Sequence, residues 1–172
     1  MKTTKTIELE NKLYQSTQKL GVFGCFEVTI GWFGKERVDY MTYDTKGIWR
    51  CYEIKVSKTD FHSKAHNTFV GNFNYYVMPK ELYEEVKEEI PSHIGIHCGD
   101  YCIKNAKKQE LGVNVEVLKD SFIRSLSREV DKQIKSRNNT LIERYKRAIK
   151  SKEAEIARYR ELYYCTLNKL GG

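Results

Sequence analysis

The sequence predicts an α/β protein, with a central mixed sheet flanked by helices and a long helical extension behind it. Residues 22–56 hold three runs rich in aromatic and β-branched side chains, separated by turns that contain Gly. Residues 119–170 hold neither Pro nor Gly and are rich in helix-favouring residues. We therefore expect one α/β domain over residues 1–118 and a basic helical, coiled-coil extension over residues 119–172.

Composition narrows the class of protein. The chain has 172 residues, of which 40% are hydrophobic and 31% charged, as in soluble globular proteins. No apolar run is long enough to span a bilayer, and the first residues lack the apolar segment of a signal peptide. The five cysteines are scattered and do not suggest a disulfide framework. We expect a cytoplasmic protein that has no contact with membranes.

The net charge of +7 is distributed unevenly. Residues 1–120 carry 17 basic and 17 acidic side chains, whereas residues 121–172 carry 13 basic and 6 acidic ones. A basic extension on a neutral domain favours a polyanionic partner, with nucleic acid as the first candidate. The alternative is a solvated helix face with more Lys and Arg than Glu, and charge alone leaves both interpretations open.

The first elements are a helix and three strands. Apolar spacing predicts a helix from Thr4 to Leu20, with Thr6 as its cap and Gly21 as its stop. Strands over residues 22–33, 37–43 and 48–56 follow and form an antiparallel meander. Glu27 alternates onto one face of the first strand, where it lies either on the surface or in a site.

The hairpin over residues 37–58 carries the chemistry. Glu53 and Lys55 point to the same face of one strand, and the turn brings Asp39 close to Glu53. Two neighbouring carboxylates repel each other unless a hard cation such as Mg²⁺ or Mn²⁺ lies between them. Lys55 beside such a cation could orient a water or hold a phosphate oxygen. The competing interpretation is an ordinary cross-strand Lys–Glu pair on an exposed hairpin.

Short helices and strands complete the domain. Ser57 and Asp60 suit a helix start, and the helix N-terminus after a strand is a natural anion site, which makes Lys58, His62 and Lys64 candidate phosphate contacts. We expect helices over residues 58–68 and 79–90, a buried parallel strand over 75–78, and strands over 94–97, 101–103 and 113–117.

Four residues raise the alternative of a zinc site. His93, His97, Cys98 and Cys102 have the right ligand types, but their spacing is not that of a standard finger. Because Gly99-Asp100 looks like a tight turn, His97 and Cys102 are better explained as cross-strand neighbours.

The hairpin resembles the PD-(D/E)xK nuclease superfamily, in which an Asp is followed by Glu-x-Lys on the next strand. The wider pattern is most similar to the MmcB-like branch of DNA-repair nucleases, with Arg-x-Asp, a turn, and Glu-x-Lys-x-Ser-x-x-Asp-Phe. The resemblance covers about residues 5–118 and departs from that pattern at Asn74 and Lys64, where acidic residues are expected. The matching residues are Arg37, Asp39, Glu53, Lys55, Ser57, Asp60 and Phe61, then Tyr75 to Pro79 and Ile90 to Gly95.

The resemblance implies a restriction-endonuclease-like core and metal-dependent hydrolysis of DNA, duplex or branched, in repair or recombination. Asp39, Glu53 and Lys55 would be catalytic, and Asp39, Glu53 and the carbonyl of Ile54 would hold Mg²⁺ or Mn²⁺. A first-helix Glu serves as a further metal-site residue in many members, which makes Glu10 a candidate ahead of Glu8. No small-molecule cofactor is implied.

The extension carries a heptad repeat. Ile142, Ile149, Ile156, Tyr163 and Leu170 recur every seven residues, as in a coiled coil or a helix laid along a core. Residues 136–140 are a weak point at which two helices could bend apart. Such a stripe serves either as a dimer interface, which would give a homodimer through the C-terminal helix, or as self-packing within one chain. Its basic flanks remain available to DNA, including Arg144, Arg147 and Lys150, and Arg37 on the domain is a further candidate contact.

Two other classes of function compete with the nuclease. One is a nuclease-fold protein without catalysis, which acts as an adaptor or inhibitor that binds nucleic acid or protein through its C-terminal helix. The other is a zinc-bound regulatory protein, which depends on the His93–Cys102 segment alone.

Overall fold

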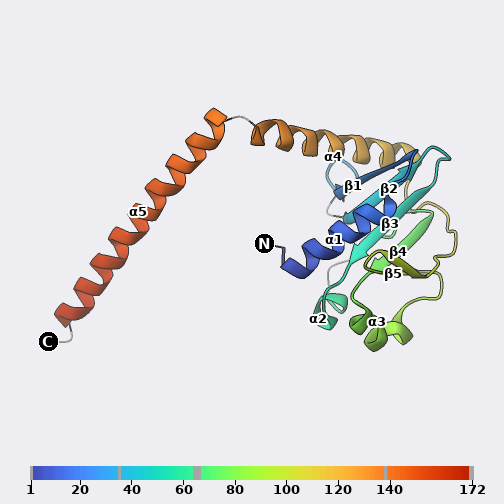
Figure 1. Cartoon of the computed structure of the whole chain (residues 1–172), viewed down its shortest axis with the longest axis horizontal. Helices are drawn as coiled ribbons and strands as arrows, with labels where there is room; N and C mark the ends of the chain where they lie inside the picture. The colour runs from blue at the N-terminus through green and yellow to red at the C-terminus, as the bar shows by residue number, and fades with distance from the viewer. Residues whose placement is uncertain (1, 35, 64–66, 138, 171–172) are drawn as a thin grey trace. The chain divides into compact units, whose positions relative to one another are not determined.

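The computed structural model describes residues 2–34, 36–63, 67–137 and 139–170 (Figure 1). The chain forms two compact units, Met1–Leu126 and Ser127–Gly172. Helix α4 (Val115–Ser136) crosses the division, and its first turns belong to the first unit. No helix in the described segments is long and apolar enough to cross a membrane.

The first unit is built on one mixed sheet of six strands. The strands are β1 (Val22–Thr29), β2 (Arg37–Asp44), β3 (Trp49–Ile54), β4 (Phe73–Val77), β5 (Gly95–Cys98) and β6 (Tyr101–Lys104). They lie side by side in chain order. β1, β2 and β3 pair antiparallel, β3, β4 and β5 pair parallel, and β6 returns antiparallel to β5. The sequence predictions of an antiparallel meander, a parallel fourth strand and a mixed sheet are confirmed.

Helix α1 (Thr4–Thr17) covers one face of the sheet. Its buried Leu9 and Leu13 pack against Tyr40, Tyr52 and Val77. The N-cap is Thr3, whose side chain accepts from the backbone N–H of Thr6, so the prediction of Thr6 as the cap was wrong by one turn. The helix also ends before the predicted stop at Gly21. Thr3 suits the cap position because its backbone is extended and its hydroxyl reaches the first free amide.

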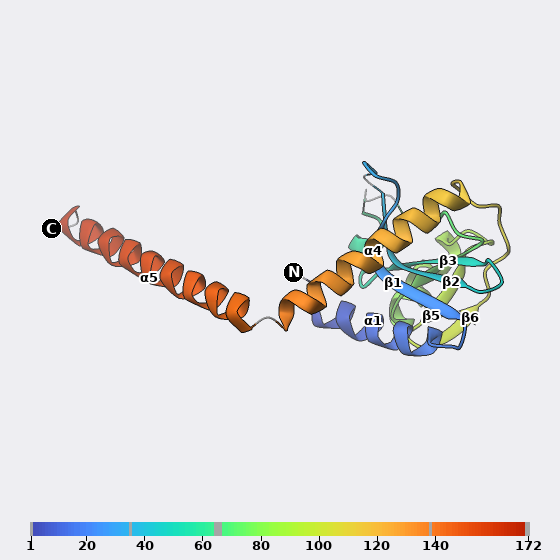
Figure 2. The ribbon, with the colours of Figure 1, turned by 90° about the horizontal axis from the view of Figure 1, so that it is seen from above.

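The opposite face is covered by α4 and α3. Phe122 on the first turns of α4 packs edge-on against Trp49, at 5.6 Å between ring centroids. Helix α3 (Lys80–Val86), continued by the 3₁₀ turn η1 (Lys87–Glu89), covers Tyr76 and Ile96. Figure 2 shows α1 and the start of α4 on opposite sides of the sheet.

Further predicted elements differ in the structure, and the first of them is the strand predicted over residues 22–33, which ends at Thr29. Helix α2 ends at Phe61 (Lys58–Phe61), and residues 67–70 have no regular structure, so the predicted helix over 58–68 was too long. The predicted strand over 113–117 was wrong, because α4 already begins at Val115. The Asn114 side chain accepts from the backbone N–H of Glu116 at 2.8 Å and starts the helix there.

The second unit contains the end of α4 and helix α5 (Asn139–Leu170). Helix α4 ends at Ser136 and α5 begins at Asn139, so the prediction of a helix boundary within residues 136–140 is confirmed. On α5, none of the described side chains is buried, and ion pairs such as Lys146–Glu143 link neighbouring turns.

Candidate active site

A cleft of about 750 Å³ opens where β3 ends. Its walls come from the start of α1, from β1 and β2, from the end of β3, and from the segment that enters α2. Asp39, Glu53, Ile54 and Lys55 all line it. Sequence segments that lie far apart in the chain therefore meet around the residues of the Asp…Glu-x-Lys pattern.

Asp39 is fixed by the backbone of the neighbouring strand. Its Oδ2 accepts a hydrogen bond from the N–H of Ile54 at 2.9 Å. Burial raises the pKa of Asp39 and the charge of Glu27 adds to this, while the Ile54 N–H, Lys55 and Arg37 act in the opposite direction. The half-buried carboxyl group is therefore held in place beside other charges.

Glu53 is the most deeply buried carboxyl group of the cleft, with 4% of its surface exposed. Its Oε1 accepts from the backbone N–H of Thr68 at 3.2 Å. Burial, followed by repulsion from Asp39, raises the pKa of Glu53 from 4.5 to about 8. In the absence of a cation, this side chain is therefore neutral over most of the physiological pH range.

Lys55 lies just past the end of β3 and is 5% exposed. Its backbone N–H donates to the carbonyl of Val77 at 2.9 Å and extends the parallel ladder by one step. Its positive charge lowers the pKa of both Asp39 and Glu53. Among the described residues, no carboxylate lies within ion-pair distance of its ammonium group. A buried ammonium in a cleft without a carboxylate in contact is suited to bind an anion that enters.

Glu27 is a third carboxylate of the cleft, which the sequence left open between surface and site. The pairs Phe26–Tyr40 and Val28–Val38 place it opposite Asp39. Its φ of 56° lies in the left-handed region, where non-Gly residues are rare. The carboxylate forms ion pairs with Lys2 at 2.8 Å and with Arg37 at 2.7 Å. No sequence pattern signals a positive φ in the middle of a strand, so this placement could not be predicted.

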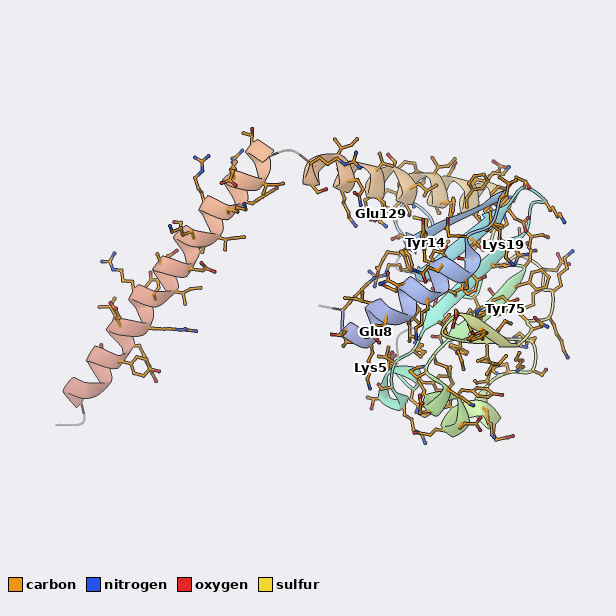
Figure 3. All side chains as sticks on the ribbon, in the orientation of Figure 1. Lys5, Glu8, Tyr14, Lys19, Tyr75 and Glu129 are labelled. Carbon is orange, nitrogen blue, oxygen red and sulfur yellow. The ribbon has the colours of Figure 1, made fainter. Side chains whose placement is uncertain are left out.

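Helix α1 contributes Glu10 to the cleft. Glu10 forms an ion pair with Lys2, so that the Lys2 ammonium lies between the carboxylates of Glu10 and Glu27. Glu8 instead lines a separate hollow together with Lys5, on the part of α1 seen in Figure 3. Of the two predicted candidates, Glu10 therefore lines the cleft and Glu8 does not.

The other predicted contacts are divided between the cleft and its surroundings. Arg37 lines the cleft, and so does Asp60, whose Oδ2 accepts from the Val56 N–H at 3.0 Å. Lys58 is exposed on α2 outside the lining, and His62 pairs with Glu89 at 2.7 Å. Lys64 lies outside the described residues. Arg144, Arg147 and Lys150 are exposed on α5.

Asn74, one of the two residues at which an acidic side chain was expected, has a structural role. Its amide side chain is fully buried, accepts from the Gly71 N–H at 3.1 Å and donates to the Gly71 carbonyl at 3.0 Å. This amide closes the turn that leads into β4, and an Asp could make only the accepting half of the arrangement.

The donor set fits a hard divalent cation. Asp39 and Glu53 offer carboxylate oxygens, the donors that such a cation prefers, and burial raises the pKa of both although Lys55 and Arg37 act in the opposite direction. Within the described ranges, no three His, Cys, Asp or Glu side chains form a ready-made metal cage. His97 and Cys102 are paired across the β5–β6 hairpin, which confirms the cross-strand interpretation of these two residues.

Comparison with known proteins establishes the fold only. No family model matches the sequence, and no curated protein matches it. Among solved structures, the chain is similar to a protein of unknown function from Silicibacter pomeroyi, with 16% sequence identity and a TM-score of 0.58. The match covers 81% of this chain and 95% of that chain. The chain therefore shares its α/β arrangement with a protein of distant sequence.

Proposed function

We propose that the chain is a metal-dependent nuclease of the PD-(D/E)xK type that hydrolyses phosphodiester bonds in DNA, in repair or recombination. The observation that carries the proposal is the meeting of Asp39, Glu53 and Lys55 in one cleft at the end of β3. The order of helix, antiparallel meander, short helix and parallel strand supports a restriction-endonuclease-like core.

Asp39 and Glu53 would hold one Mg²⁺ or Mn²⁺, with the Ile54 carbonyl as a further ligand and Glu10 as an additional metal-site residue. When bound, such a cation polarises the scissile phosphate and lowers the pKa of a water. The protein's part is to position both carboxylates through the backbone N–H groups of Ile54 and Thr68. These two hydrogen bonds hold the ligands in place before any substrate arrives.

In this proposal, Lys55 acts on the attacking water and on the substrate phosphate. Its buried ammonium orients the attacking water and offsets the negative charge that develops on the phosphate. Arg37, on the rim of the same cleft, offers a guanidinium group to the neighbouring phosphate. The basic residues of α5 supply affinity that falls with salt concentration.

The experiment is cleavage of labelled linear, single-stranded and branched DNAs by the wild-type chain and by Lys55→Ala, with Mg²⁺, Mn²⁺ or chelator. We expect metal-dependent cleavage that Lys55→Ala reduces at least about a hundredfold while DNA binding persists. Lys80→Ala on α3 is the matched control, since it removes an exposed lysine away from the cleft. Absence of cleavage on every substrate, with binding intact, would reject the nuclease.

A second candidate is a nuclease-fold adaptor or inhibitor that works through α5. The large apolar side chains exposed along that helix favour it, because such surfaces usually serve binding. Metal analysis separates the two candidates: Mn²⁺ binding that Asp39→Ala abolishes supports the nuclease, and a chain that binds DNA but no metal supports the adaptor.

A further inference from the structure

Helix α5 presents an exposed apolar stripe along its length. Tyr145, Ile149, Ile156, Tyr159 and Tyr163 are each between 51% and 63% exposed. None of the described side chains of α5 is buried, although most of the stability of helices in proteins comes from the packing of an amphipathic face. The stripe therefore needs a partner surface to account for a helix of 32 residues.

The spacing of the stripe defines the geometry of that partner. Ile142, Ile149, Ile156 and Tyr163 occupy one position of a heptad, and Tyr145 and Tyr159 occupy the position three residues later. A strict seven-residue repeat stays on one side of a helix when that helix supercoils with one or more partner helices. In parallel coiled coils, β-branched residues at the heptad position of Ile142, Ile149 and Ile156 favour an assembly of two helices.

Charged residues beside the apolar stripe favour one relative orientation of two paired α5 helices over the other. In a parallel pair in register, Glu155 of one helix faces Arg160 of the other, and this contact occurs twice. If the two helices overlapped along the same length but ran antiparallel, Glu153 would lie near Glu153 of the other helix and Glu155 near Glu155. These like charges would repel each other. The pattern therefore favours the parallel arrangement.

Lys152 is the charged exception within the seam. Its ammonium group forms an ion pair with Glu155 of the same helix at 2.8 Å and its side chain is 77% exposed. A long lysine stem can cover apolar surface while its charge stays in water, so the seam tolerates it at a cost in stability.

We propose that α5 is the dimerisation element of this protein and that its occupant is α5 of a second copy, parallel and in register. The dimer leaves the basic residues outside the seam exposed, so that two copies present a doubled basic surface to a polyanion. The inference depends on α5 alone and is independent of the chemistry of the cleft.

Sedimentation equilibrium of the full chain tests the proposal. We expect a mass near twice the 20.2 kDa of one chain, with a dissociation constant that Ile156→Asp raises by at least about a hundredfold. Ala157→Asp, one residue away and outside the seam, should leave the mass unchanged, and Lys152→Leu should tighten the dimer. A monomeric wild-type chain at concentrations of tens of micromolar, or equal effects of Ile156→Asp and Ala157→Asp, would overturn the proposal.

A charge exchange tests the orientation. Glu155→Arg alone should weaken the dimer roughly fivefold, and adding Arg160→Glu should restore it, because the exchanged charges at these two positions then attract each other again across the two helices. The matched pair Glu153→Arg with Arg160→Glu should not restore the wild-type dissociation constant. A Glu155→Arg chain that dimerises as tightly as the wild type, or one that Arg160→Glu does not restore, would overturn the parallel arrangement. Circular dichroism of each variant verifies that the helix is present.

Discussion

At the scale of single residues, the protonation of Glu53 makes the stability of the folded chain depend on pH. Its pKa is about 8 in the folded chain against an ordinary value of 4.5, because burial and Asp39 disfavour the charge. The unfolded chain releases this proton above pH 4.5, whereas the folded chain keeps it until about pH 8. Without a divalent cation, the free energy of unfolding should therefore fall as the pH rises from 4.5 to about 8.

Urea denaturation in chelator at several pH values measures this slope. Glu53→Gln carries no titrating group at that position and should show a flatter profile over the same interval. Asp39, whose pKa is also raised, still titrates in the variant and acts in the same direction. Identical profiles for the two chains would contradict the assigned role of Glu53.

Glu27 makes a second prediction at this scale, from its backbone. A left-handed conformation costs a non-Gly residue about 1 kcal/mol or more, and Gly adopts it freely. Glu27→Gly and Glu27→Ala both lose the ion pairs with Lys2 and Arg37. The free energy of unfolding of the Gly variant should therefore be about 1 kcal/mol higher than that of the Ala variant. A Gly variant that is no more stable would show that the φ of Glu27 is unimportant for folding.

Residue alternation was enough to predict that Asp39, Glu53 and Lys55 share one cleft. Glu53 and Lys55 share a face because they are two apart on a strand, and the hairpin places Asp39 beside them. Glu27 and Asp60 could not be predicted as cleft residues, because one depends on a positive φ and the other on the path of the chain after β3.

At the scale of elements, α4 shows how a helix is divided between burial and exposure. Phe122 is 5% exposed against Trp49, whereas the adjacent Ile123 is 63% exposed. Phe122→Ala should lower the free energy of unfolding by about 3 kcal/mol. Ile123→Ala, the neighbouring control, should change it by less than about 0.5 kcal/mol. Thermal or urea unfolding measures both, and equal losses would contradict the packing of α4 on the sheet.

Strands were easier to predict than helix ends. Aromatic and β-branched runs bounded by turns fixed β1 to β5 because a pleated, half-buried strand requires those residue types. The strand expected at residues 113–117 failed because Val115 and Val117 alternate as in a strand, while Asn114 caps a helix. Local pattern alone does not decide between the two, and the burial of Leu118 on the sheet does.

At the scale of the whole molecule, the two units should have different functions, with the cleft in the first and additional DNA affinity in the second. A chain that ends at Ser136 keeps the sheet, the cleft and the buried turns of α4. We expect it to unfold at the same urea concentration as the full chain, and to bind DNA more weakly with a smaller dependence on salt. Binding titrations at two salt concentrations check this. Unchanged DNA affinity would mean that α5 does not contribute to it.

The order of the strands has a consequence for how the chain acquires its structure. Each strand pairs with the one before it in sequence, so the sheet can grow strand by strand as the chain leaves the ribosome, with few long loops to close. The face around Trp49 is different, because Leu118 and Phe122 cover it and are synthesised after every strand. A nascent chain shorter than about 120 residues therefore exposes an apolar sheet surface, which is the stage at which chaperones would bind it.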